Sequence, residues 1–237
     1  MRNYTVNWGR FLLLRWFVAS WLLHGVHVFD KTERAYYIIC ELLIYVFFCL
    51  LINMSGVTDW WVYLLAFIIV HTVTWLVDSH WLVGYREVDK SFKGKGIGSV
   101  IEFAQLAKSN LIGYNSVDAI CIYGSLCRRM YHDRSDMDLR VVQTGKSFKL
   151  FWEIQKLRFV GIWRYRIPLD LKLVDSVEYL KKEMRLDEKP IMLYKRGLTF
   201  FNEGVDFIDL VNRPNLFSKN TPPYRCRIVK NNYYKAA

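Results

Sequence analysis

The sequence predicts a mixed α/β domain, of the α+β class, preceded by an all-α transmembrane module. Two apolar runs, 35–54 and 60–77, lie near the N-terminus, and each is about 20 residues long, enough to cross a hydrocarbon core of about 30 Å as a helix. Further along the chain, short apolar runs typical of strands alternate with longer runs of helical spacing, which predicts a small mixed sheet with flanking helices. These segments are 100–111 (helix), 119–123 (strand), 137–142 (strand), 147–162 (helix) and 165–174 (strand).

Residues 1–83 form the predicted membrane module. Its first apolar segment, 11–29, contains Arg15. Because a charge near the middle of a span is costly, we expect a helix that lies at the membrane interface, with a full span as the alternative. The link between the two long runs carries no Lys or Arg, whereas basic residues flank the pair: Lys31, Arg34, Arg86, Lys90, Lys93 and Lys95. The positive-inside rule then places both ends of the hairpin, and the domain that follows, on the cytoplasmic side of an inner or plasma membrane.

Two polar residues interrupt the long apolar runs. Glu41 has two interpretations: a polar contact with a partner or a lipid headgroup, or a side chain near the cytoplasmic end that reaches the interface or is protonated. His71 is expected to be satisfied by a contact between helices.

The rest of the chain divides into a linker at 84–98, a domain at 99–200 and a C-terminal tail at 201–237. Several glycines lie among charged residues in the linker, a composition that disfavours regular structure. Glycine and proline residues also interrupt the tail, so we expect it to be loosely structured and to pack on the domain or touch the membrane.

The composition favours a membrane surface and phosphorylated substrates as partners. The net charge is +11, which suits anionic lipids and phosphates as well as nucleic acid. Since the chain also carries membrane-like runs, nucleic acid is not needed to explain this charge. The five cysteines show no CxxC or other metal-binding spacing, so we expect them to be reduced and the soluble part to be cytoplasmic.

The most informative segment is 119–142. Its first strand ends in Gly124 and Ser125, and Asp136 and Asp138 follow at the start of the next strand. Residues i and i+2 of a strand point to the same face, so the two carboxylates can converge on a hard cation such as Mg²⁺. The Gly-Ser turn offers N–H groups and a hydroxyl to a polyphosphate, and a short helix expected at 126–131 would add its positive N-terminal end.

With these residues the segment resembles the nucleotidyltransferase superfamily, which includes DNA polymerase beta. The resemblance extends over 97–194 and implies a third carboxylate on a later strand. Asp170, in the predicted strand 165–174, is the candidate. Asp175 is its rival, but it falls at the end of that strand, where a turn residue is expected.

The resemblance implies a membrane-anchored transferase that depends on Mg²⁺, or on Mn²⁺ in its place, and that moves a nucleoside monophosphate from a nucleoside triphosphate to an acceptor hydroxyl. Pyrophosphate would leave. The implied catalytic and metal-binding residues are Asp136, Asp138 and Asp170. The implied nucleotide-binding residues are Gly124, Ser125, Arg128, Arg129 and Arg140, of which the arginines alternatively form a solvated basic surface.

The membrane module is the only sequence feature that bears on the acceptor. It favours a lipid-linked or surface-polysaccharide precursor or a membrane protein, and no nucleic-acid template is expected. A membrane-protein partner or a homo-oligomer is also compatible with it. The alternative function is a catalytically silent, nucleotide-binding sensor or scaffold subunit of a membrane complex.

Overall fold

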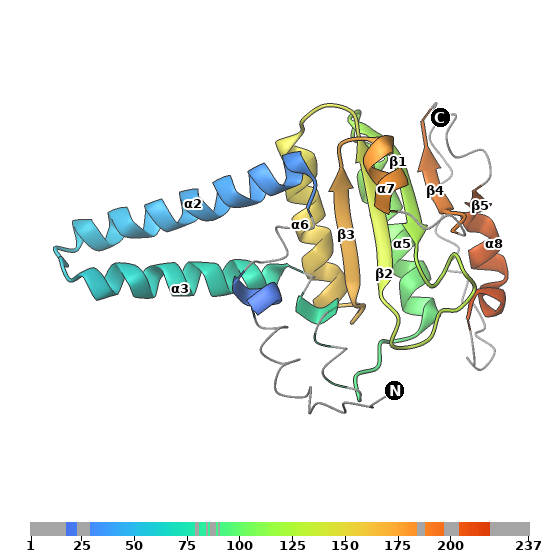
Figure 1. Ribbon diagram of the computed structural model, residues 1–237, viewed down its shortest axis with the longest axis horizontal. Helices are drawn as coiled ribbons and strands as arrows, with labels where there is room; N and C mark the ends of the chain where they lie inside the picture. The colour runs from blue at the N-terminus through green and yellow to red at the C-terminus, as the bar shows by residue number, and fades with distance from the viewer. Residues whose placement is uncertain are drawn as a thin grey trace, which may run out of the picture.

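The computed structural model describes residues 18–22, 29–78, 81–83, 85, 89, 91–183, 188–196 and 204–218. These residues form an α/β body from which a hairpin of two long helices projects (Figure 1). The mixed α/β class that the sequence predicts is therefore confirmed.

The strands of the described chain form one mixed sheet. They are β1 Val117–Tyr123, β2 Met137–Gln143, β3 Leu169–Val174, β4 Ile191–Lys195 and β5 Val205–Asp206. Their order is β3-β2-β1-β4-β5. The central strand β1 is antiparallel to β2 and β4, whereas β2 is parallel to β3, and β4 is parallel to β5. The edge strand β3 lies on the side of the sheet from which the hairpin projects (Figure 1).

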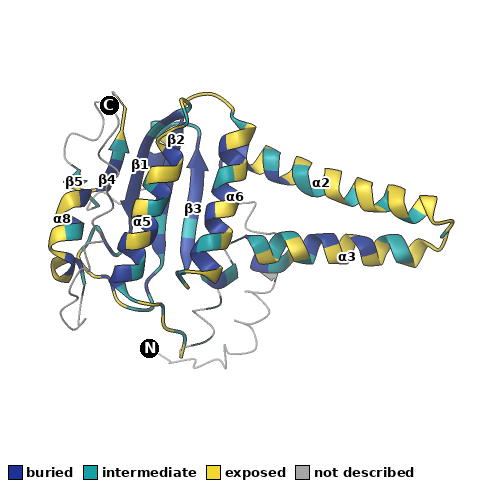
Figure 2. Ribbon diagram, turned by 180° about the vertical axis from the view of Figure 1, so that it is seen from behind, coloured by how far each residue is buried: buried dark blue, intermediate teal, exposed yellow. Residues whose placement is uncertain are grey.

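Helices α5 (Ile97–Leu111) and α6 (Phe148–Trp163) cover one face of the sheet (Figures 1 and 2). Core residues of the strands point toward this face and are fully buried, such as Met137 and Leu139 of β2. A smaller helix, α7 (Val177–Glu183), packs Leu180 on the opposite face. Residues that alternate with the core positions, such as Asp138, project onto this second face.

The hairpin consists of α2 (Lys31–Met54) and α3 (Trp60–Val77). Both helices are long and apolar enough to cross a membrane, and only 6% of the apolar window of α2 and 17% of that of α3 is buried inside the protein. These helices contain the runs predicted at 35–54 and 60–77. Most of the interfacial helix predicted at 11–29 lies outside the described residues. Within that range, the described residues Val18–Leu22 form a short π-helix, η1.

The first turn of α2 belongs to the core of the α/β body. Glu33 forms an ion pair with Arg158 of α6, and both side chains are completely buried. The Glu33 carboxylate also accepts the N–H of Leu173 at 3.1 Å, and the Arg158 guanidinium donates to the carbonyl of Leu171 at 2.6 Å. Both backbone groups belong to the edge strand β3. The pair therefore satisfies polar groups of a strand edge that would otherwise be open to pairing with another chain.

A reciprocal pair of caps strengthens this junction. Asp30 accepts the N–H of Lys31 at 2.7 Å as the N-cap of α2, and it also accepts the N–H of Asp175 at 2.9 Å. In return, the Asp175 carboxylate accepts the N–H of Thr32 at 2.9 Å. Asp175, the rival to Asp170, thus holds the base of the hairpin. The sequence assigned residues 1–83 to a separate module, but the start of α2 is integrated into the domain.

The C-terminal segment also differs from expectation. A loose tail was predicted from residue 201, but 204–218 form β5, α8 (Phe207–Asn212) and a 3-10 helix, η4 (Pro214–Phe217). Phe207, Leu210 and Phe217 are buried in the main core. The apolar run in this segment is too short to stand out against the neighbouring glycine and proline signals, although the spacing of Phe207 and Leu210 is helical.

We predict that Arg158→Met will destabilise the protein by about 3–5 kcal/mol, because it leaves the Glu33 carboxylate buried without its partner. Thermal unfolding in detergent measures the change. The matched control is Lys156→Met on the same helix, which removes an exposed pair with Glu153 and should cost less than about 1 kcal/mol. Equal effects of the two substitutions would contradict the assigned role of the buried pair.

Candidate functional site

The structure brings Asp138 and Asp170 side by side at one end of the sheet. Asp138 is in β2 and Asp170 is in β3, and the two residues are direct partners in the parallel register. Both alternate with fully buried core residues, so their side chains project from the same face of the sheet. Asp170, the candidate third carboxylate, therefore lies next to Asp138.

Gly124 packs directly against one of these carboxylates. It follows β1, whose last residue, Tyr123, pairs with Asp138. Gly124 has φ +75°, and a Cβ at this position would lie 2.0 Å from Oδ2 of Asp138. A glycine is therefore required both by the left-handed backbone and by the space that the carboxylate occupies. The next residue, Ser125, has a buried hydroxyl with no hydrogen-bond partner in the described part of the chain.

Arg140 neutralises part of the carboxylate charge. Its guanidinium lies 2.7 Å from Oδ2 of Asp170 and 3.6 Å from Oδ1 of Asp138, and it also donates to the backbone carbonyl of Asp170 at 2.5 Å. The ammonium of Lys172 is 3.8 Å from the same Asp170 oxygen. Arg140 was predicted to bind nucleotide; in this structure its nearest anionic partners are the candidate site carboxylates.

The environment of Asp138 favours its protonated form. Burial is the largest cause, and the charges of Asp136 and Asp170 add to it, so that the pKa of Asp138 rises from 3.8 to about 7. The positive charge of Arg140 opposes this shift. Asp136, just before β2, therefore belongs electrostatically to the same cluster.

The loop after Ser125 departs from the predicted short helix at 126–131. Residues 124–129 form turns, in which the N–H of Met130 donates to the carbonyl of Ser125 at 2.8 Å. Arg129 has φ +57°, a left-handed conformation that ends a helix. The prediction that a helix N-terminus contributes to phosphate binding here is therefore wrong.

Arg128 and Arg129 are held by the C-terminal third of the chain. Arg128 pairs with Glu188, and the Arg129 guanidinium lies 5.8 Å from the centre of the Phe217 ring. The N–H of Tyr131 donates to the carbonyl of Phe217 at 3.1 Å. The segment that was expected to be a tail therefore supports the candidate phosphate-binding loop, a role that no local sequence signal indicated.

The donor set suits magnesium in its chemistry. Asp136, Asp138 and Asp170 offer only carboxylate oxygens, which Mg²⁺ prefers. Burial and then carboxylate repulsion raise the pKa of Asp138, and a bound cation would relieve that repulsion. Among the described residues, however, no three His, Cys, Asp or Glu side chains are already arranged to hold a metal ion. Asp170 is engaged by Arg140 in this arrangement.

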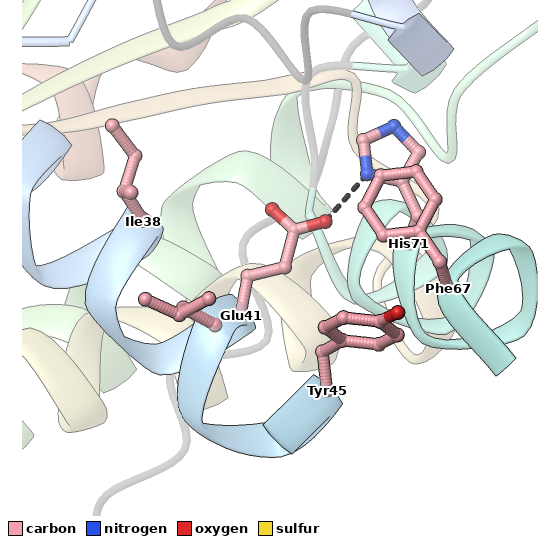
Figure 3. A pocket seen from close by; sticks show the side chains of 6 residues that line it. Ile38, Glu41, Tyr45, Phe67 and His71 are labelled. Atoms are coloured by element: carbon pink, nitrogen blue, oxygen red, sulfur yellow. Dashed lines mark hydrogen bonds and ion pairs between the residues drawn. The ribbon is translucent and has the colours of Figure 1, made fainter. Parts of the chain in front are cut away.

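A second polar cluster lies between the hairpin helices (Figure 3). Nδ1 of His71 is 2.5 Å from Oε1 of Glu41, and Nε2 of His71 is 2.8 Å from the carbonyl oxygen of Trp21. The pair lines a pocket of about 230 Å³. His71 is satisfied by helix contacts, as expected, and Glu41 makes a polar contact within the hairpin itself. The sequence did not connect the two residues, because their separation along the chain exceeds any helical period.

The chain matches no protein-family model, no curated protein and no solved structure. The resemblance to the nucleotidyltransferase superfamily therefore depends on the motif residues alone. Three of these residues, Gly124, Asp138 and Asp170, meet at one end of the sheet.

We predict that Gly124→Ala will displace the Asp138 carboxylate and destabilise the protein by more than Gly145→Ala does. Gly145 has φ +83°, but nothing lies within 4 Å of a Cβ added there, so its substitution costs only the left-handed backbone strain of about 1–2 kcal/mol. The unfolding temperatures of the two variants separate the cost of the clash with Asp138 from the cost of the left-handed backbone. Equal losses of stability would show that Asp138 does not occupy the space beside Gly124.

A pH dependence follows from the raised pKa of Asp138. The folded protein binds this proton more tightly than the unfolded chain, so stability falls as the carboxyl ionises between pH 3.8 and about 7. Relative to Asp138→Asn, the wild-type protein should therefore lose stability over this range, and the difference should stay constant at higher pH. Unfolding temperatures of both proteins across the range test this, and parallel profiles would refute it.

Proposed function

We propose that this protein is a membrane-anchored nucleotidyltransferase that moves a nucleoside monophosphate from a nucleoside triphosphate to an acceptor hydroxyl. The observation that carries the proposal is the convergence of Gly124, Asp138 and Asp170. These residues come from three separate segments, and they meet at one end of the sheet.

Each residue has a chemical role in such a reaction. Mg²⁺, when bound to the carboxylates, would neutralise the charge that develops on the phosphates. The turn at Gly124 and Ser125 offers backbone N–H groups to the β- and γ-phosphates, and the buried Ser125 hydroxyl can donate to a phosphate oxygen. Arg140, beside the carboxylates, can balance the same charge.

The bond changes are those of a direct displacement. The acceptor oxygen bonds to the α-phosphorus while the bond from this phosphorus to the bridging oxygen breaks, and pyrophosphate leaves with that electron pair. The proton of the acceptor hydroxyl passes to a carboxylate of the cluster. Asp170 is the candidate acceptor of this proton.

The hairpin supports a membrane-bound location for this activity. Two apolar helices with exposed side chains would insert in a bilayer, and the flanking Lys31 and Arg34 favour a cytoplasmic orientation of the domain at an inner or plasma membrane. An acceptor that is itself held at the membrane, either lipid-linked or a protein, is consistent with this placement.

A nucleotide sensor or scaffold subunit is the second candidate. The contact that favours it is the ion pair between Arg140 and Asp170. A guanidinium in this position supplies positive charge where a catalytic metal would otherwise be needed. Such a protein would bind nucleotide without transferring it.

The deciding experiment is label transfer with the full-length protein in detergent or nanodiscs. The protein is incubated with Mg²⁺ and nucleoside triphosphates labelled at the α-phosphate, with and without a membrane lipid extract. We predict label transfer by the wild-type protein, and loss of transfer in Asp138→Asn. The matched control, Asp209→Asn, removes an exposed carboxylate on α8 and should leave transfer unchanged.

Ser125→Ala separates nucleotide binding from folding. The Ser125 hydroxyl has no partner in the described chain, so its removal should not lower stability, while triphosphate binding should weaken. Binding without transfer by the wild-type protein would favour the sensor, and neither binding nor transfer would refute both proposals.

A further inference from the structure

Helix α6 exposes a stripe of large aromatic side chains. Four aromatic residues of α6 lie along one edge of its buried face, and each is 47–55% exposed. Their spacing along the helix places them within one narrow arc. These residues are Phe148, Trp152, Phe159 and Trp163. Exposed aromatic surface of this size is unusual for a helix that faces only water.

The stripe is continuous with the base of the hairpin at both ends. The Phe148 ring lies 5.6 Å from Tyr36 of α2, in an edge-to-face contact. At the other end, the Trp163 ring lies 6.5 Å from Trp81, which in turn lies 5.8 Å from Trp75 of α3. Helix α6 contacts both hairpin helices, and it runs across their base rather than along them (Figure 1).

The buried face of α6 shows how the stripe is oriented. Phe151, which packs on Tyr36, and Arg158, which pairs with Glu33, point toward the hairpin side. In helical projection the aromatic arc follows directly after these positions. The exposed residues Lys149 and Lys156 fall on the far side of the arc, away from the hairpin. The order around the helix is therefore hairpin contact, aromatic stripe, basic flank.

We propose that the aromatic face of α6 lies in the headgroup region of the same bilayer that the hairpin enters, with its basic flank on anionic lipid. The proposal rests on the membrane anchorage proposed above. Aromatic side chains concentrate at membrane interfaces, and helices that lie there combine an aromatic or aliphatic face with Lys and Arg. A hairpin that crosses the bilayer would hold α6, which lies across its base, against the membrane surface.

This docking determines which part of the sheet is nearest the lipid. The edge strand β3 lies beside α6 and the base of α2, and β2 is the next strand, about 4.8 Å further away. Asp170 and Asp138 are therefore on the two strands nearest the bilayer. The proposed docking therefore places the strands that carry the candidate site nearer the bilayer than β1, β4 and β5.

Photo-crosslinking tests the proposal. The photoreactive residue p-benzoylphenylalanine (Bpa) is introduced as Trp152→Bpa, Leu43→Bpa or Ile208→Bpa in the full-length protein, in nanodiscs of phosphatidylcholine and phosphatidylglycerol. Leu43 is 62% exposed in the middle of α2, and Ile208 is 61% exposed on α8, beside the edge of the sheet opposite β3. Mass spectrometry after illumination identifies what each position has bonded to.

Lipid adducts at positions 43 and 152, with none above background at 208, are the expected result. Lipid adducts at 43 without any at 152 would overturn the docking of α6 while leaving the anchorage in place. An adduct from 152 to a second copy of the chain would also overturn it. Absence of lipid adducts at 43 would refute the anchorage, and the docking with it.

Discussion

The buried ion pair between Glu33 and Arg158 is the contact on which the arrangement of hairpin and domain depends. It joins the first turn of α2 to α6, and it also satisfies backbone groups of the edge strand β3. A membrane helix attached only by a flexible linker would leave that edge open. Because β3 carries Asp170, the contact that attaches the hairpin also positions the strand that supplies one of the candidate site carboxylates.

The elements that the sequence predicted are those with strong local signals. The hairpin helices follow from the length of their apolar runs, and the face to which Asp138 points follows from the alternation along its strand. Asp170 was expected as a further carboxylate only from the resemblance, and its pairing with Asp138 is known from the structure. Glu33 could not be recognised in this way, because its partner lies 125 residues further along the chain and an acid in a first helical turn is ordinarily exposed. The turn after Ser125 was mistaken for a helix because the left-handed backbone at Arg129 has no sequence signature in a residue other than Gly or Asn.

The candidate site combines an excess of carboxylates with the close guanidinium of Arg140. Gly124 leaves space for the Asp138 carboxylate at the end of β1. Burial and neighbouring charges favour the protonated form of Asp138, and Arg140 limits the repulsion among the carboxylates. A cluster held in this state gains from any cation that replaces the proton on Asp138. Its position on the two strands nearest the proposed membrane surface would bring the proposed transfer close to an acceptor held in the bilayer.

The central claim is that these carboxylates bind a divalent cation together with a nucleotide. Electron paramagnetic resonance tests it directly, since the signal of free Mn²⁺ falls when the ion binds to protein. We predict that wild-type protein with a non-hydrolysable nucleoside triphosphate will bind Mn²⁺ beyond what the nucleotide alone binds, and that Asp138→Asn will abolish this excess. Equal Mn²⁺ binding by the wild-type and Asp138→Asn proteins would contradict the account.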